Sequence, residues 1–217
     1  AALSPAEVLA QVAQALPPDV RGNVIIIGSL AAGYHFFAGD GDRAIRTKDV
    51  DCLFSPHSKA VAAATEVTDQ LIRANWTLRE GQDWSQPGKK EDREEDLPMV
   101  RLRPPDEMTS PWFLELLSAP PAFEPGAPGK KLRRVETSIG NFAICSFDFL
   151  ALAESEPLET VHGVRIARPE MMALANLLHH PTIADKLIVG TDDKRSNKDL
   201  GRVLALAPGL GDMSAAW

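Results

Sequence analysis

The sequence predicts an α/β protein: a small mixed sheet with helices on its faces, followed by a mainly helical C-terminal part. Residues 24–27, in an expected strand over 23–27, form an apolar, β-branched run that stops at Gly28 and Ser29, and a helix pattern follows directly. Residues 48–54 again have a strand pattern, and 59–75 carry apolar side chains at helical spacing. This alternation of strand and helix patterns is typical of a sheet covered by helices.

The elements around this centre follow from the same periodicities. Ser4 begins the first helix as its N-cap, with Pro5 in the first turn and Glu7 completing a capping box, and Pro17 ends it. The alternating or apolar runs predict strands over 76–79, 100–103, 112–117, 135–139, 142–147 and 161–167.

Two further stretches differ from this pattern. Residues 82–96 are polar, mixed in charge sign and almost free of aliphatic side chains, which predicts a solvated or mobile loop. Near the C-terminus, a short helical piece over 149–153 precedes a long helix over 170–180, and a last helical region begins near residue 184. The C-terminal part is therefore mainly helical.

The composition describes a globular chain with enough apolar material for a core. It has 217 residues, 44% of them hydrophobic and 24% charged, and a formal net charge of −7. That charge argues against a surface coated for nucleic acid but leaves room for a local basic groove. Cys52 and Cys145 lack the spacing of a disulfide framework or a zinc site. Without an apolar run of membrane-spanning length or a signal peptide, we expect a cytoplasmic protein with no membrane span.

Two carboxylates open the strand over 48–54. Successive strand side chains point to opposite faces, so Asp49 and Asp51 share a face, with Cα atoms roughly 6.5 Å apart. At a separation of about 5 Å, two such charges repel by about 3 kcal/mol at an effective dielectric constant near 20. A cation would offset this repulsion, and the oxygen ligands favour Mg²⁺ or Mn²⁺. The sequence thus predicts a metal site beside a glycine turn.

These residues resemble the motifs of the nucleotidyltransferase superfamily of the DNA polymerase β type. Its signature is a Gly-Ser or Gly-Gly turn, a helix, and then Asp-x-Asp. The resemblance is greatest to the toxin-like AbiEii/MenT branch, in which the turn runs into a helix of small residues and Arg-Thr/Ser-x-Asp-x-Asp follows. In this chain the two motifs are Gly28-Ser29-Leu30-Ala31-Ala32-Gly33 and Arg46-Thr47-Lys48-Asp49-Val50-Asp51.

The resemblance implies a nucleotidyltransferase fold and a transfer reaction. Residues 1–160 would form the catalytic core, and 161–217 a helical part packed on it. The enzyme would move a nucleoside monophosphate from an NTP to a hydroxyl of RNA, such as tRNA, or of protein. Gly28 and Ser29 would bind the triphosphate, because a helix start offers free N–H groups and the positive end of its dipole. The alternative is a plain strand–turn–helix junction.

The resemblance also implies a role for a further carboxylate in the expected sheet. In this fold a third carboxylate enters from a neighbouring strand, and Glu115 is the candidate, as a catalytic base or a further metal ligand. Glu115 can instead be an edge residue that faces water. Lys48, like Arg46, either contacts phosphate or neutralises the aspartates structurally.

The C-terminal region carries a weaker match. Toxin-like nucleotidyltransferases have a helical lysine and, further on, a basic run that ends in Lys/Arg-Asp-Leu. Lys186 matches the first, and Asp199, within Lys198-Asp199-Leu200, matches the second. By this resemblance Lys186 holds nucleotide phosphates, and Asp199 orients Lys186 or Arg195. An ordinary salt-bridged helix surface is the alternative.

Other functions remain open at this stage, and several are disfavoured. The chain lacks the P-loop motif, the Gly-x-Ser-x-Gly elbow and the protein-kinase motifs. One alternative is a small-molecule nucleotidyltransferase, since an acidic cleft suits a cationic acceptor such as an aminoglycoside. Another is a nucleotide-binding or partner-binding module on a degenerate version of the fold. For the toxin-like interpretation, the partners are an NTP, an acceptor RNA or protein, and an antitoxin protein.

Overall fold

The computed structural model describes residues 4–37, 49–79, 86–105, 112–121, 131–187 and 203–204. Its helices, in chain order, are α1 (Pro5–Ala15), α2 (Pro18–Arg21), α3 (Gly28–Phe37), α4 (His57–Arg73) and α5 (Pro169–Leu187), with 3-10 helices η1 (Glu94–Asp96) and η2 (Asp148–Glu154). Its strands are β1 (Val24–Ile27), β2 (Asp49–Phe54), β3 (Thr77–Leu78), β4 (Arg101–Arg103), β5 (Phe113–Ser118), β6 (Lys131–Thr137), β7 (Gly140–Ser146), β8 (Leu158–Glu159) and β9 (Arg165–Ile166).

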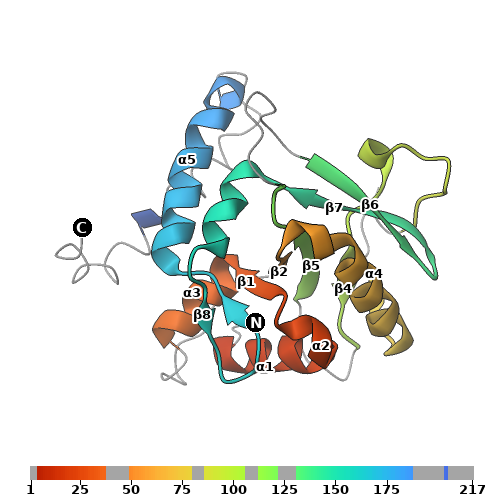
Figure 1. Cartoon of the computed structure of the whole chain (residues 1–217), viewed down its shortest axis with the longest axis horizontal. Coiled ribbons are helices and arrows are strands. Elements are labelled where there is room, and N and C mark those ends of the chain that lie inside the picture. Colours follow the sequence, from red (N-terminus) through yellow and green to blue (C-terminus); the bar gives the residue numbers. More distant parts are fainter. Residues whose placement is uncertain are drawn as a thin grey trace.

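The described strands form one mixed sheet with helices on both faces, which confirms the predicted fold class (Figure 1). The main strand order is β3-β4-β5-β2-β1-β9-β8, and β7 joins β5 to the β6 edge. β2 runs antiparallel to β1 and parallel to β5. β2 and β5 therefore lie in the interior of the sheet, where they need apolar side chains on both faces.

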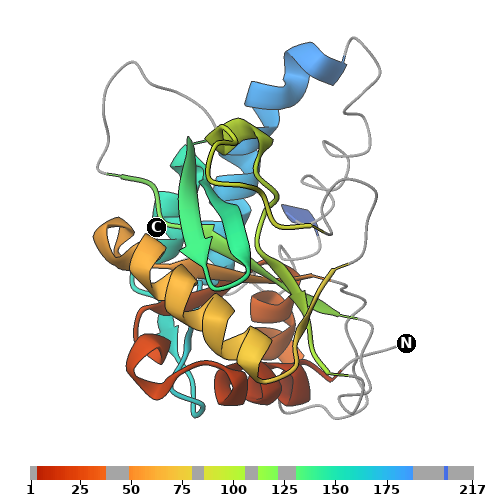
Figure 2. The same ribbon diagram turned by 90° about the vertical axis from the view of Figure 1, so that its right-hand side faces the viewer.

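Two apolar layers cover the two faces of the sheet. On one face, α1, α3 and α4 pack on a core that includes Ile26, Cys52 and Leu116. On the other, η2 and α5 pack on a smaller core that includes Ile27, Leu53 and Leu117. Figure 2 shows α4 and α5 on opposite sides of the sheet. Because Asp49 and Asp51 alternate with Val50 and Cys52, they point to the second face.

The first helix begins as predicted. The side chain of Ser4 accepts a hydrogen bond from the N–H of Glu7 at 3.4 Å, and α1 ends at Ala15, just before the prolines. β1, β2, β5 and α4 also lie within about two residues of their predicted bounds.

The C-terminal half differs from the prediction in two places. Only Arg165–Ile166 (β9) of the expected strand over 161–167 is a strand. It forms a hairpin with β8, because Thr160 to Gly163 form a turn in which Gly163 has a φ of +76°. β9 pairs with β1, so the sheet continues past residue 160, the predicted end of the core. The long helix does not stop at residue 180, since α5 is continuous to Leu187.

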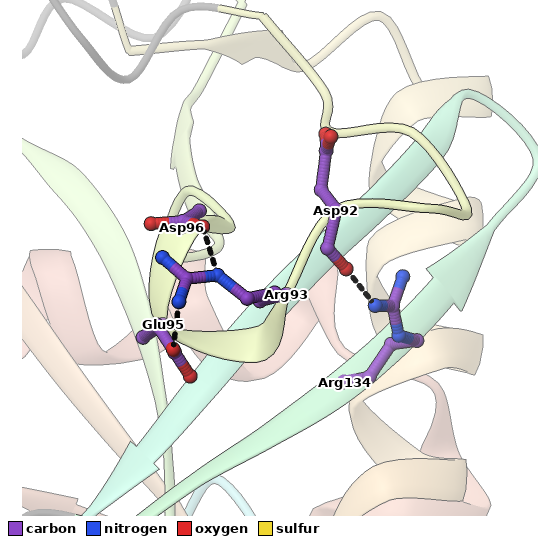
Figure 3. A network of polar contacts seen from close by, with 5 residues as sticks. All are labelled: Asp92, Arg93, Glu95, Asp96 and Arg134. Atoms are coloured by element: carbon purple, nitrogen blue, oxygen red, sulfur yellow. Dashed lines mark hydrogen bonds and ion pairs between the residues drawn. The ribbon is translucent and has the colours of Figure 1, made fainter.

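The charged stretch that was expected to be a solvated or mobile loop is docked where the structure describes it. Gly88 forms a two-way backbone bridge with Asn141 of β7, at 2.8 and 2.9 Å. Arg134 of β6 donates to the carbonyl oxygen of Lys89. It also donates to the carbonyl oxygen of Asp92, while Arg93 lies between Glu95 and Asp96 (Figure 3). Many of these side chains are exposed, but the backbone is fixed to the β6–β7 pair.

Candidate active site

Gly28 and Asp51 bring the two predicted motifs into contact. Ile27, the last residue of β1, is paired with Asp51 of β2, so the turn begins one residue beyond the carboxylate. Gly28 has a φ of +74°, and a Cβ atom at this position would lie 2.8 Å from Asp51 Oδ2. Only glycine accepts this backbone conformation without strain and leaves room for the carboxylate. The start of α3 and the aspartate strand are therefore neighbours in space as well as in motif order.

The aspartates are half-buried at the start of a strand whose other face is buried. Asp49 and Asp51 are both partly exposed, whereas Val50 and Cys52 are fully buried. Burial raises the pKa of the Cys52 thiol, and the negative charge of Asp51 raises it further. The carboxylate of Asp51 thus acts electrostatically on its surroundings.

Glu115 lies beside Asp51, as predicted for a third carboxylate from a neighbouring strand. β2 and β5 are parallel with Asp51 in register with Glu115, so both side chains point to the same face. The alternative that Glu115 is an edge residue facing water is wrong. β5 lies between β4 and β2, and the Glu115 side chain is only 14% exposed.

Arg101 is a site residue that could not be assigned from the sequence. It faces Glu115 across the β4–β5 pair, and its Nε and Nη2 atoms donate to the two carboxylate oxygens at 2.9 and 3.1 Å. This bidentate ion pair offsets the cost of a carboxylate inside the sheet. The alternation of Arg101, Leu102 and Arg103 indicates only that the two arginines share one face of the strand predicted over 100–103. The partner of Arg101 depends on the β4–β5 register, which no local pattern reveals.

The donor set of Asp49 and Asp51 fits a hard divalent cation. Magnesium is commonly held by one or two carboxylates, with waters and substrate phosphates completing its octahedron. Among the described residues, no group of three or more His, Cys, Asp and Glu side chains is arranged to hold a metal. Glu115 as a third ligand therefore stays a prediction, and its oxygens bond Arg101 here.

The remaining predicted residues belong to other parts of the chain. Ser29 is partly buried in the first turn of α3, next to Gly28. Lys186 lies in the last turn of α5, but its side chain is outside what the structure describes. Lys48, Arg195 and Asp199 lie outside the described residues altogether.

Comparisons with known proteins found no match to this chain among family models, curated proteins or solved structures. No helix among the described ranges combines the length and hydropathy that crossing a membrane requires.

Proposed function

We propose that the chain is a metal-dependent nucleotidyltransferase that moves a nucleoside monophosphate from an NTP to a hydroxyl of RNA or protein. The observation that carries this proposal is the contact between Gly28 and the Asp51 carboxylate. This contact supports the proposal because the first turn of α3 and the strand that carries both aspartates meet there. We further propose that the enzyme is a toxin with an antitoxin partner, on the resemblance of the two motifs alone.

Four residues of the candidate site have a role in this reaction: Ser29, Asp49, Asp51 and Glu115. Ser29 and the free N–H groups of the first turn of α3 bind the β and γ phosphates. Asp49 and Asp51 supply the carboxylate oxygens that hold Mg²⁺ or Mn²⁺. A cation held by these two residues would supply Lewis-acid chemistry, which stabilises negative charge on phosphate oxygens and lowers the pKa of a nearby hydroxyl.

The transfer step is a substitution at the α-phosphorus. The oxygen of the acceptor hydroxyl forms a bond to this atom, and the bond from the α-phosphorus to the α–β bridging oxygen breaks. Pyrophosphate leaves with the electron pair of that bond. Glu115 is the candidate to take the hydroxyl proton, because it lies on the same face as Asp51 and next to it in register.

The experiment is transfer of label from each α-³²P-NTP, in the presence of Mg²⁺, to total RNA and to lysate protein separated afterwards. We expect label in one fraction with the wild type and a loss of at least a hundredfold in Asp49→Asn and Asp51→Asn. Asp19→Asn is the matched control, since Asp19 is an exposed carboxylate in α2. Unchanged labelling in the Asp49 and Asp51 variants would overturn the proposal.

The Arg101–Glu115 ion pair favours a second candidate function, a nucleotide-binding module without turnover. A carboxylate with both oxygens bonded to a guanidinium is a poor base as it stands. This candidate predicts NTP binding with no label transferred to RNA, protein or small-molecule acceptors under any metal condition.

A further inference from the structure

Three arginines lie on the same face of the sheet as the aspartates. The β4–β5 register places Arg101 on the face of Glu115, and Arg103, two residues on, shares that face. The β3–β4 register pairs Thr77 with Arg103, and the N–H of Arg79 donates to the carbonyl of Arg101. We call Arg79, Arg101 and Arg103 the arginine strip. It runs from the β3 edge of the sheet toward β2.

Arg79 lies over an aromatic ring that adjoins the candidate active site. Its guanidinium carbon is 3.9 Å from the centre of the Phe113 ring. Phe113 is in register with Asp49 on the adjacent strand, and its side chain is almost fully buried. Arg79 is partly exposed, so its guanidinium forms a planar, cationic platform over β5, the strand next to Asp49.

The charge of the strip is only partly matched by the described residues around it. Glu115 neutralises Arg101. No ion pair among the described residues involves Arg79 or Arg103, and Arg103 is exposed. Two guanidinium groups that have no ion-pair partner among the described residues favour an anionic ligand at this place.

We propose that the arginine strip binds the acceptor, and that the acceptor is a single-stranded nucleic acid. This inference rests on the proposed function, because it names the substrate class of the same site. Arg101 and Arg103 face the phosphates, and a nucleobase stacks on the Arg79 guanidinium. Arginine planes are common stacking surfaces for unpaired bases, and arginine forks match phosphate geometry.

The same geometry disfavours a polycationic acceptor. An aminoglycoside that approaches Asp49 from the β3 edge meets Arg79 and Arg103 first, and like charges oppose its binding. A protein segment offers no general match for a planar cationic platform, whereas every nucleobase presents a π-face.

Fluorescence anisotropy of a labelled single-stranded RNA 12-mer tests this proposal with the full-length protein in EDTA and without NTP. We expect Arg79→Ala and Arg103→Ala each to weaken binding about tenfold. Arg133→Ala is the matched control, since Arg133 is an exposed arginine on β6, and it should leave affinity unchanged. Two phosphate contacts predict a slope of about −1.4 in log affinity against log salt concentration. Circular dichroism and thermal unfolding verify that each variant is folded.

Arg79→Lys separates stacking from charge, because lysine keeps the charge but lacks the plane. We expect it to weaken RNA binding nearly as much as Arg79→Ala, while binding to inorganic polyphosphate stays close to wild type. Wild-type affinity for RNA in Arg79→Lys, equal losses in all three alanine variants, or no RNA binding by the wild type would overturn the proposal. Since the assay needs neither metal nor NTP, a failure of label transfer alone overturns only the proposed function.

Discussion

The carboxylate of Asp51 occupies the space that a side chain at residue 28 would need. Its Oδ2 atom lies 2.8 Å from the ideal Cβ position of Gly28, and Gly28 has a positive φ of +74°. The close approach and the positive φ both require glycine at the junction of β1 and α3. With glycine there, the strand that carries the aspartates lies against the start of α3.

Gly28→Ala is expected to lose both stability and NTP affinity. The left-handed backbone costs an L-residue about 1–2 kcal/mol, and the Cβ atom pushes the Asp51 carboxylate away from the turn. Denaturant unfolding and NTP titration measure the two effects. Gly22→Ala is the control, because Gly22 has a φ of −64° and a Cβ atom added there would meet no other atom within 4 Å. Equal stability of the two variants would contradict the role given to Gly28.

The Arg101–Glu115 ion pair is expected to show strong energetic coupling. Arg101→Gln leaves a carboxylate that is 14% exposed without its two guanidinium hydrogen bonds, which we expect to cost about 1–3 kcal/mol. A double-mutant cycle with Glu115→Gln, measured by urea unfolding, should give a double variant that loses less than the sum of the single losses. Additive losses would mean that the pair contributes no coupling.

Arg134 is expected to hold the 86–97 stretch on the sheet. Its guanidinium donates to two backbone carbonyls, and its backbone N–H donates to Glu94 Oε1 at 3.3 Å. Arg134→Ala should increase hydrogen exchange at the amides of Gly88 and Asn141 about tenfold, with little change in global stability. Arg133→Ala, the exposed neighbour on the same strand, should leave these rates as they are. The same rates in both variants would exclude an anchoring role for Arg134.

The Cys52 thiol is expected to make stability fall at alkaline pH. Because burial, and then Asp51, raise its pKa in the folded state, the unfolded chain loses the proton first. Its contribution is fully present below the unfolded pKa of about 8.5. As the pH rises, it is lost at up to about 1.4 kcal/mol per pH unit until the folded thiol titrates. Urea unfolding between pH 7 and 10 should show a steeper decline for the wild type than for Cys52→Ala. Parallel curves would contradict this assignment.

Much of the fold could be predicted from the sequence because its periodicities are local. The β-branched run at Val24–Ile27 predicts a strand, and the amphipathic pattern of α4 predicts a helix, each from its own residues alone. The strand order could not be predicted, because it depends on which strands pair with one another. No local sequence pattern reveals that pairing, for example between β4 and β5. The docking of residues 86–97 on the sheet was also not predicted, because the hydrogen bonds that fix it come from Arg134, which is distant in sequence.

The candidate site was predictable to the extent that it lies on short motifs. The glycine turn and the two aspartates are visible in sequence, and the structure brings Gly28 and Asp51 together. Arg101 and Arg79 were missed, because arginines in alternating strands usually face solvent. Their partners, Glu115 and Phe113, are defined only by contacts across the sheet.

Divalent-cation binding by Asp49 and Asp51 is the most direct test of the central claim. Mn²⁺ titration, followed by electron paramagnetic resonance with a non-hydrolysable NTP analogue present, measures it without turnover. We predict saturable binding by the wild type and by Asp19→Asn, and at least tenfold weaker binding by Asp49→Asn and Asp51→Asn. Mn²⁺ affinity that is the same in all four proteins would show that the aspartates hold no metal and would contradict the proposed catalytic site.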